Sequence, residues 1–222
     1  MSPGSYNTAS TYGSVARAFH WLTALLILTE IPLGLYANRL PVSDGEALAR
    51  AAFYFSAHKS LGVVIFIVAL ARIVWALRQP QPADQHPDRT VETLAASAVH
   101  WSLYLALVLV PLTGWLSHAA STGFAPIWGP IGQTLPLVPK SDATAHVFAT
   151  LHVLFGKVLA VSILLHVAGA LKHLLIDRDA TFARMWSGKP SPAEANEAPK
   201  SIVAVLTALG AYTAAICVGL AL

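Results

Sequence analysis

The sequence predicts an all-α integral membrane protein: a four-helix bundle followed by a fifth C-terminal transmembrane helix. Two observations carry this prediction. Hydrophobic residues make up 55% of the 222 residues and charged residues only 11%, whereas a typical soluble domain has about 25% charged residues. Mean hydropathy is +0.60. In addition, five apolar runs are each long enough to cross the hydrocarbon core as a helix.

The five predicted spans follow one another along the chain, over residues 17–38, 53–77, 94–118, 149–177 and 201–222. The first four form a predicted domain of residues 1–198, and the fifth is an additional membrane helix within residues 199–222. The segment 119–145 is apolar but interrupted by prolines, so we expect it to lie in the membrane interface as a cap. Residues 1–16 and 178–200 are polar and are expected to form a tail and a linker.

Charged and helix-breaking residues mark the ends of these spans. Arg17 begins the first span and Arg39 follows it. Arg78 follows the second span and precedes the proline-rich and charged connection 79–93. Arg178 follows the fourth span. Each boundary therefore has a residue type that belongs outside the hydrocarbon.

The lysines and arginines near the span ends predict the orientation, because cytoplasmic ends carry the excess of these residues. Eight lie on the side of the N-terminus: Arg17, Arg78, Arg89, Lys172, Arg178, Arg184, Lys189 and Lys200. Five lie on the other side: Arg39, Arg50, Lys59, Lys140 and Lys157. We therefore expect a cytoplasmic N-terminus and, with five spans, a C-terminus on the outer side of the membrane.

Charge and cysteine content limit the cofactors and partners. The net charge of +3 comes from residues at span ends and does not indicate nucleic-acid binding. Cys217 is the single cysteine. This excludes an internal disulfide, a C-x-x-C-H haem attachment and an all-cysteine iron–sulfur cluster. A haem in this chain would be non-covalent and held by histidines.

Fourteen residues separate His152 and His166 inside the fourth span. At about 100° and 1.5 Å per residue, both imidazoles point to one side of the helix, roughly 21 Å apart along its axis. A histidine in a lipid-spanning segment is costly and is a functional candidate. Zinc ligands from one helix come three or four residues apart, so zinc does not explain this spacing. We predict that this span borders two haems and gives one axial ligand to each of them.

Depth in the membrane gives each of these histidines a partner. His20 begins the first span at the depth of His166, and His58 begins the second span level with His152. We predict that His20 and His166 (the inner pair) and His58 and His152 (the outer pair) are the iron ligands of two b-type haems. The alternative for any one of them is a hydrogen bond between a buried imidazole and a backbone carbonyl.

The other five histidines have weaker patterns. His173 lies seven residues beyond the inner ligand of its span, so it is the rival inner ligand or a membrane-edge residue near propionates or quinone. His100 faces the bundle, but its span has no second deep histidine. His118 and His146 are expected to be hydrated residues at the outer edge, and His86 lies in a loop and is assigned no role.

Two charged residues lie within the spans. Arg72 is fourteen residues after His58, so it points the same way at the depth of the inner haem, where a propionate would be its counter-charge. The alternative is that Arg72 snorkels to the inner surface. Glu30 lies in the middle of the first span, and the sequence alone does not decide between a protonated carboxyl, a hydrogen-bonded one and a proton path to quinone.

Glycines accompany the predicted outer ligands. Gly62 and Gly156 each follow an outer ligand by four residues, and Gly34 follows His20 by fourteen. The missing side chains would admit a macrocycle, or they could ease the approach of neighbouring helices.

These residues lie in stretches that resemble the prokaryotic diheme cytochrome b-561 family: RAFHWLTALLIL, HKSLGVVIFIVALARIVWAL, HWSLYLALVLVPLTGWL and LHVLFGKVLAVSILLHVAGALKHLLIDRDATFARMW. The resemblance implies a four-helix bundle that holds two b-type haems by bis-histidine ligation. The family positions match His20, His58, His152 and His166, the four residues reached from spacing and depth.

The resemblance also implies a function. The family passes electrons from an outer-face donor to membrane quinone, and it includes a bacterial superoxide:ubiquinone oxidoreductase. We therefore expect a quinone-linked oxidoreductase with no catalytic side chain of its own, an outer-face donor such as superoxide, and ubiquinone as acceptor. The alternative is a haem-b membrane subunit that relays electrons for a docked dehydrogenase or hydrogenase.

The fifth span is a departure from the family pattern, as is Glu30. Small residues form a stripe along this span: Ala204, Ala208, Ala211, Ala215 and Gly219. Such stripes let membrane helices approach closely. We expect the fifth span to carry no cofactor and to pack against its own bundle, a second copy or a partner subunit.

Overall fold

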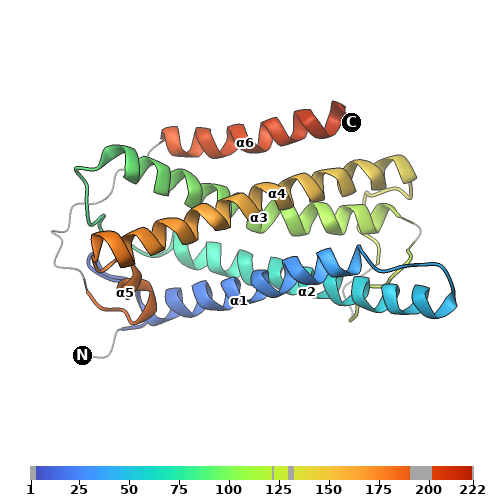
Figure 1. The fold of residues 1–222 in the computed structure, drawn as a ribbon, viewed down its shortest axis with the longest axis horizontal. Coiled ribbons are helices and arrows are strands. Elements are labelled where there is room, and N and C mark those ends of the chain that lie inside the picture. Colours follow the sequence, from blue (N-terminus) through green and yellow to red (C-terminus); the bar gives the residue numbers. More distant parts are fainter. Residues whose placement is uncertain (1–3, 122, 130–132, 191–201, 222) are drawn as a thin grey trace. The chain divides into compact units, whose positions relative to one another are not determined.

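The computed structural model describes residues 4–121, 123–129, 133–190 and 202–221. Within these ranges every regular element is helical, which confirms the all-α prediction. The elements are α1 (Ser14–Ala37), α2 (Gly45–Leu77), α3 (Thr90–Ala120), α4 (Asp142–Lys172), the short π-helix η1 (His173–Asp177), α5 (Thr181–Trp186) and α6 (Ile202–Ala221) (Figure 1). The predicted boundary between residues 198 and 199 lies outside the described residues.

The helices α1, α2, α3 and α4 all begin earlier than the sequence pattern predicts, and capping residues account for α2 and α4. Residues 45–52 were expected to be loop but form the first turns of α2, because Asp44 caps the helix by accepting a hydrogen bond from the Ala47 N–H at 2.9 Å. Likewise α4 begins at Asp142, where the Ser141 hydroxyl oxygen accepts a hydrogen bond from the Thr144 N–H. Polar capping residues set these starts, and hydropathy does not detect them.

Five of the helices in the described residues are long and apolar enough to cross a membrane. Large aliphatic side chains point outward, as shown by Leu25, which is 65% exposed, and Leu164, which is 70% exposed. The most deeply buried residues are small, among them Ala51, Ala69 and Ala106. Small residues inside and large apolar residues outside are the arrangement of helices that pack in lipid.

The chain divides into two compact units. We name each unit after the predicted histidine pair that it contains: the inner unit is Met1–Trp21, Leu70–Ala106 and Lys157–Ala214, and the outer unit is Leu22–Ala69, Leu107–Gly156 and Ala215–Leu222. Each of α1, α2, α3, α4 and α6 contributes a stretch to both units. The inner pair of histidines lies wholly in the inner unit and the outer pair wholly in the outer unit.

In the inner unit, α6 packs against α3 of its own chain. The Tyr212 hydroxyl donates a hydrogen bond to the Ser102 carbonyl at 2.9 Å, and Ala204 and Ala208 are buried beside it. The predicted stripe is therefore wrong at one position, since Ala211 is exposed and Tyr212 is buried in its place. Its hydroxyl finds a backbone acceptor, which makes an aromatic residue more favourable than a small one there.

In the outer unit, α6 approaches α4 at a glycine. A Cβ atom at Gly219 would lie 3.0 Å from Leu154 Cδ1, so the missing side chain allows the close contact. The segment after α3 folds against α2 through backbone groups, because the Trp128 N–H donates to the Ser60 hydroxyl and Lys59 Nζ donates to the Ala125 carbonyl. This connection is non-helical wherever the structure describes it.

Candidate functional site

The outer pair consists of His58 on α2 and His152 on α4. Their ring centres lie 6.0 Å apart, and the ring planes are inclined by 77°. The His152 ring packs against α3 and the His58 ring packs against α1. Because these contacts are made by Nδ1, Nε2 is the nitrogen that remains to bind a metal.

The His152 ring lies against α3 at a glycine. Its Nδ1 is 2.9 Å from the Val110 carbonyl oxygen, and since a carbonyl only accepts, Nδ1 carries the proton. The ring can come this close because Gly114, one helical turn further along, has no side chain. A Cβ there would lie 3.0 Å from both Cε1 and Nδ1 of His152. The arrangement leaves Nε2 as the nitrogen with a free lone pair.

The His58 ring lies against α1 in a similar position. Its Nδ1 is 3.0 Å from Glu30 Oε1, an ion-pair distance, but the contact lacks the geometry of a hydrogen bond. Four residues after Glu30, a Cβ on Gly34 would lie 2.6 Å from Cε1 and 2.9 Å from Nδ1 of the ring. Both outer histidines thus rest on a glycine, with an oxygen close to Nδ1 from the residue four positions earlier on the same helix.

Glu30 is therefore a partner of a predicted ligand and not an isolated charge in the membrane. Its other oxygen, Oε2, is buried without a hydrogen-bond partner among the described atoms. A Cβ on Gly62 would lie 3.2 Å from Glu30 Oε1. The carboxyl group thus lies beside Gly62, the glycine expected to admit a macrocycle.

The inner pair consists of His20 on α1 and His166 on α4. Their ring centres also lie 6.0 Å apart, with the planes inclined by 55°. Arg72, predicted to lie at this depth, is beside them: its Nη2 is 3.4 Å from His20 Nδ1, and its guanidinium lies 5.8 Å from the centre of the Tyr104 ring.

A separation of 6.0 Å fits two imidazoles that share one metal. An imidazole nitrogen binds a metal at about 2.0 Å and lies about 1.1 Å from its ring centre, so opposed ligands place their ring centres about 6.2 Å apart. Both predicted pairs match this separation. His100 lies closer to the inner ligand of α4, with ring centres 5.1 Å apart, which is too short for two imidazoles on opposite sides of one metal. Its Nδ1 donates instead to the Ala96 carbonyl.

The remaining histidines differ from expectation at two positions. His118 was expected to be hydrated at the outer edge, which is wrong: it is 4% exposed, with Nε2 2.7 Å from Gln133 Oε1 and Nδ1 3.2 Å from Lys59 Nζ. His86, expected to have no role, contacts Asp179 at 3.0 Å. His146 is exposed, as expected.

Sequence reasoning missed Val110 and Gly114 as the support of His152, and it missed the closeness of His100 to His166. The available signal was the spacing shared by Glu30 with Gly34 and by Val110 with Gly114.

Most of the chain matches known proteins of one kind. A family model described as prokaryotic cytochrome b561 matches residues 11–188. The chain is 31% identical over 188 residues to cytochrome b561 homolog 2 of Escherichia coli (strain K12), covering 83% of this chain and 95% of that protein. It is 25% identical over 182 residues to the probable superoxide oxidase CybB of Yersinia pestis, covering 80% and 97%.

A third relative, cytochrome b561 homolog 1 of Escherichia coli (strain K12), is 23% identical over 167 residues, covering 75% of this chain and 91% of that protein. The family match ends before α6. The chain therefore belongs to the prokaryotic cytochrome b561 family, which implies a bacterial membrane protein that transfers electrons with haem b.

Proposed function

We propose that this protein carries electrons across the bacterial inner membrane through two b-type haems, from an anionic donor at the periplasmic face to membrane quinone. The donor that fits best is superoxide, and the acceptor is ubiquinone. In this arrangement the N-terminus is cytoplasmic and the C-terminus periplasmic.

The observation that carries the proposal is the equal separation of the two histidine pairs. His58 with His152, and His20 with His166, each have ring centres 6.0 Å apart, and each pair lies within one compact unit. Two pairs at the separation of a shared metal favour two haems over one. Bound haem would supply a one-electron carrier at each pair.

The side chains around each pair hold the ligands in place. Val110 and Glu30 engage Nδ1 of the two outer histidines, which leaves Nε2 of each ring to face the iron. At the inner pair, ligation through Nε2 requires the proton on Nδ1 of His20. The Arg72 guanidinium, which only donates, would then pair with an anionic group such as a propionate.

The outer unit offers positive charge to an incoming anion. Lys59 follows His58 directly in sequence, and its ammonium group is held by the Ala125 carbonyl and by His118. Lys140 is held by the Ser121 carbonyl at 2.6 Å. Cations fixed near a redox site raise the local concentration of an anionic substrate such as superoxide. The relative named as a probable superoxide oxidase supports the same donor at 25% identity.

Haem content is the first test. Haem extracted from the purified protein into acid–organic solvent should amount to about two per chain, because non-covalent haem is extractable. His58→Ala and His152→Ala should each remove the outer haem and largely spare the inner one, and His20→Ala and His166→Ala should do the reverse. A ratio near one haem per chain, or loss of the inner haem in His173→Ala and not in His166→Ala, would overturn the assignment.

Turnover is the second test. The purified protein should reduce a soluble ubiquinone analogue with superoxide, and Lys59→Gln should lower the rate more at low than at high ionic strength, because salt screens the attraction. Lys157→Gln, which removes a charge from the middle of α4 in the inner unit, serves as the control. Reduction that requires a copurifying soluble redox subunit would favour the alternative function, a relay for a docked dehydrogenase or hydrogenase.

A further inference from the structure

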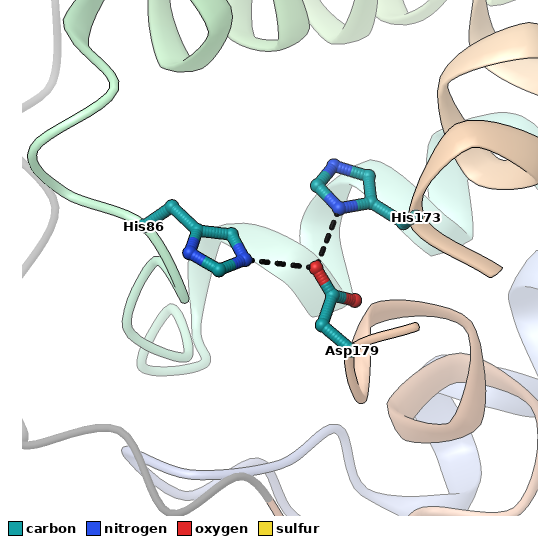
Figure 2. Close-up of side chains that lie close together, drawn as sticks. All are labelled: His86, His173 and Asp179. Carbon is teal, nitrogen blue, oxygen red and sulfur yellow. Dashed lines mark hydrogen bonds and ion pairs between the residues drawn. The ribbon is translucent and has the colours of Figure 1, made fainter. Parts of the chain in front are cut away.

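A second group of metal-ligand side chains lies in the inner unit, apart from the two histidine pairs. Figure 2 shows His86, from the connection between α2 and α3, and His173, from η1, both directed at Asp179 in the turn before α5. His86 Nε2 is 3.0 Å and His173 Nδ1 is 2.7 Å from the same carboxylate oxygen, Oδ2. The three donors thus come from three separate segments and converge on one point.

The donor atoms are close to the spacing that a metal ion requires. They all lie within 4.8 Å of one another. Donor atoms around a tetrahedral ion with bonds of about 2.0 Å are about 3.3 Å apart. The two histidine–carboxylate distances of 3.0 and 2.7 Å would therefore lengthen by about 0.3 and 0.6 Å around an ion. The two imidazole rings are nearly parallel, inclined by 5°, with their centres 6.3 Å apart.

Asp179 differs from the neighbouring carboxylates in its charge balance. Glu92 and Asp177 are both bridged by Lys172, at 2.6 and 2.7 Å, and Arg89 approaches both. Within the described ranges, the ion pairs of Asp179 are with the two histidines only. This half-buried carboxylate therefore has no lysine or arginine partner among the described residues.

Asp179 is also oriented before any ion arrives. The Thr181 N–H occupies Oδ1 at 2.8 Å, which turns Oδ2 toward the imidazoles. Gln85, next to His86, ties the connection to this turn by bonding the Ala180 N–H and the Thr181 hydroxyl.

We propose that His86, His173 and Asp179 bind one divalent transition-metal ion, and that Zn²⁺ is the ion that fits best. Two imidazoles and one carboxylate are a donor set typical of zinc, with water as the fourth ligand. Magnesium and calcium prefer oxygen donors throughout and do not suit two imidazoles. An ion here would link the α2–α3 connection to the end of α4, at the predicted cytoplasmic surface.

Equilibrium dialysis of the haem-loaded protein against buffered ZnCl₂, after removal of any polyhistidine tag, measures the binding. We expect one saturable Zn²⁺ per chain, and X-ray absorption at the zinc edge should show two imidazole nitrogens and a carboxylate oxygen at about 2.0 Å. His86→Ala and Asp179→Asn should each weaken binding by about tenfold or more. His146→Ala removes an exposed histidine elsewhere and should leave the affinity unchanged.

Haem content and the melting temperature of the zinc-free variants show whether they fold. His86→Ala removes a side chain from a surface connection, so it remains decisive even if Asp179→Asn loses haem. The proposal is overturned if the protein shows no saturable binding at micromolar Zn²⁺, if the spectrum shows no imidazole ligand, or if well-folded His86→Ala binds Zn²⁺ as tightly as the unaltered chain. His86, His173 and Asp179 would then be a hydrogen-bonded group without a metal.

Discussion

Replacing Gly34 with alanine should remove the outer haem and spare the inner one. The added Cβ would lie 2.6 Å from Cε1 and 2.9 Å from Nδ1 of His58. Carbon atoms in ordinary contact are about 3.5–4.0 Å apart, so the ring would have to move by about 1 Å. A ring that serves as an axial ligand cannot make this movement and keep its bond to iron.

The size of the effect follows from the cost of overfilling a packed site. Extra methyl groups in such sites cost about 1–3 kcal/mol, which corresponds to about 5- to 150-fold weaker haem binding at 1.4 kcal/mol per factor of ten. Gly114→Ala should have a smaller effect, because its Cβ would lie 3.0 Å from the His152 ring. We therefore expect Gly34→Ala to weaken haem binding more than Gly114→Ala does.

The assay is the ratio of extracted haem to protein, together with a redox titration of the reduced-minus-oxidised spectrum. One of two one-electron components should disappear in Gly34→Ala. Gly210→Ala is the matched control, because nothing lies within 4 Å of the added Cβ on α6. Two haems with unchanged potentials in Gly34→Ala would refute the reasoning, and so would loss of both haems while the Gly210→Ala control behaves normally.

Four further outcomes are expected. Glu30→Gln should raise the potential of the outer haem by on the order of 100 mV if the carboxylate is ionised. This value corresponds to roughly 2 kcal/mol, the interaction of a unit charge about 7 Å from the iron at an effective dielectric constant of about 20. An unchanged redox titration would indicate a neutral carboxyl. Arg72→Leu should retain both haems and lower the inner potential in the same titration, because a nearby cation favours the reduced haem; no shift would mean that the guanidinium does not act on the haem. Ala208→Leu should weaken the packing of α6 by about 1–3 kcal/mol, because residue 208 is only 3% exposed and the larger side chain overfills the site. Limited proteolysis should then cut α6 more readily without loss of haem, whereas Leu209→Ala, on the exposed side, should not change the cutting. The pKa of Asp179 is lowered from 3.8 to about 2 in the folded protein, so its stabilisation is present above about pH 4 and is lost as the pH falls toward 2; Asp179→Asn should flatten thermal stability over that window, and parallel curves would contradict this.

Much of the fold is predictable because the bilayer imposes a simple local rule. A helix must be apolar over its whole span, so hydropathy alone located all five long helices. The helix ends were less predictable, since Asp44 and Ser141 start α2 and α4 through single capping hydrogen bonds. The short α5 was missed because it lies in a polar segment whose residues carry no membrane signal.

The pairing of the histidines could be predicted from the regular geometry of a helix. The spacing of His152 and His166 on one helix, with the depth of His20 and His58, indicated which rings could face each other, because helix rise and rotation are constant. The structure brings the members of each predicted pair to the same separation. Their role as haem ligands remains a prediction for the variants above.

The sequence by itself determined that this chain is an all-helical membrane protein and which histidines share a depth, since composition and helical period are properties of single segments. Only the tertiary structure decided that His118 is buried against Gln133, that Glu30 contacts His58, and that His86 and His173 share Asp179. These contacts join residues far apart in the chain. They depend on how each helix is rotated about its axis and on where the connections fold back. Neither property can be inferred from a local pattern in the sequence.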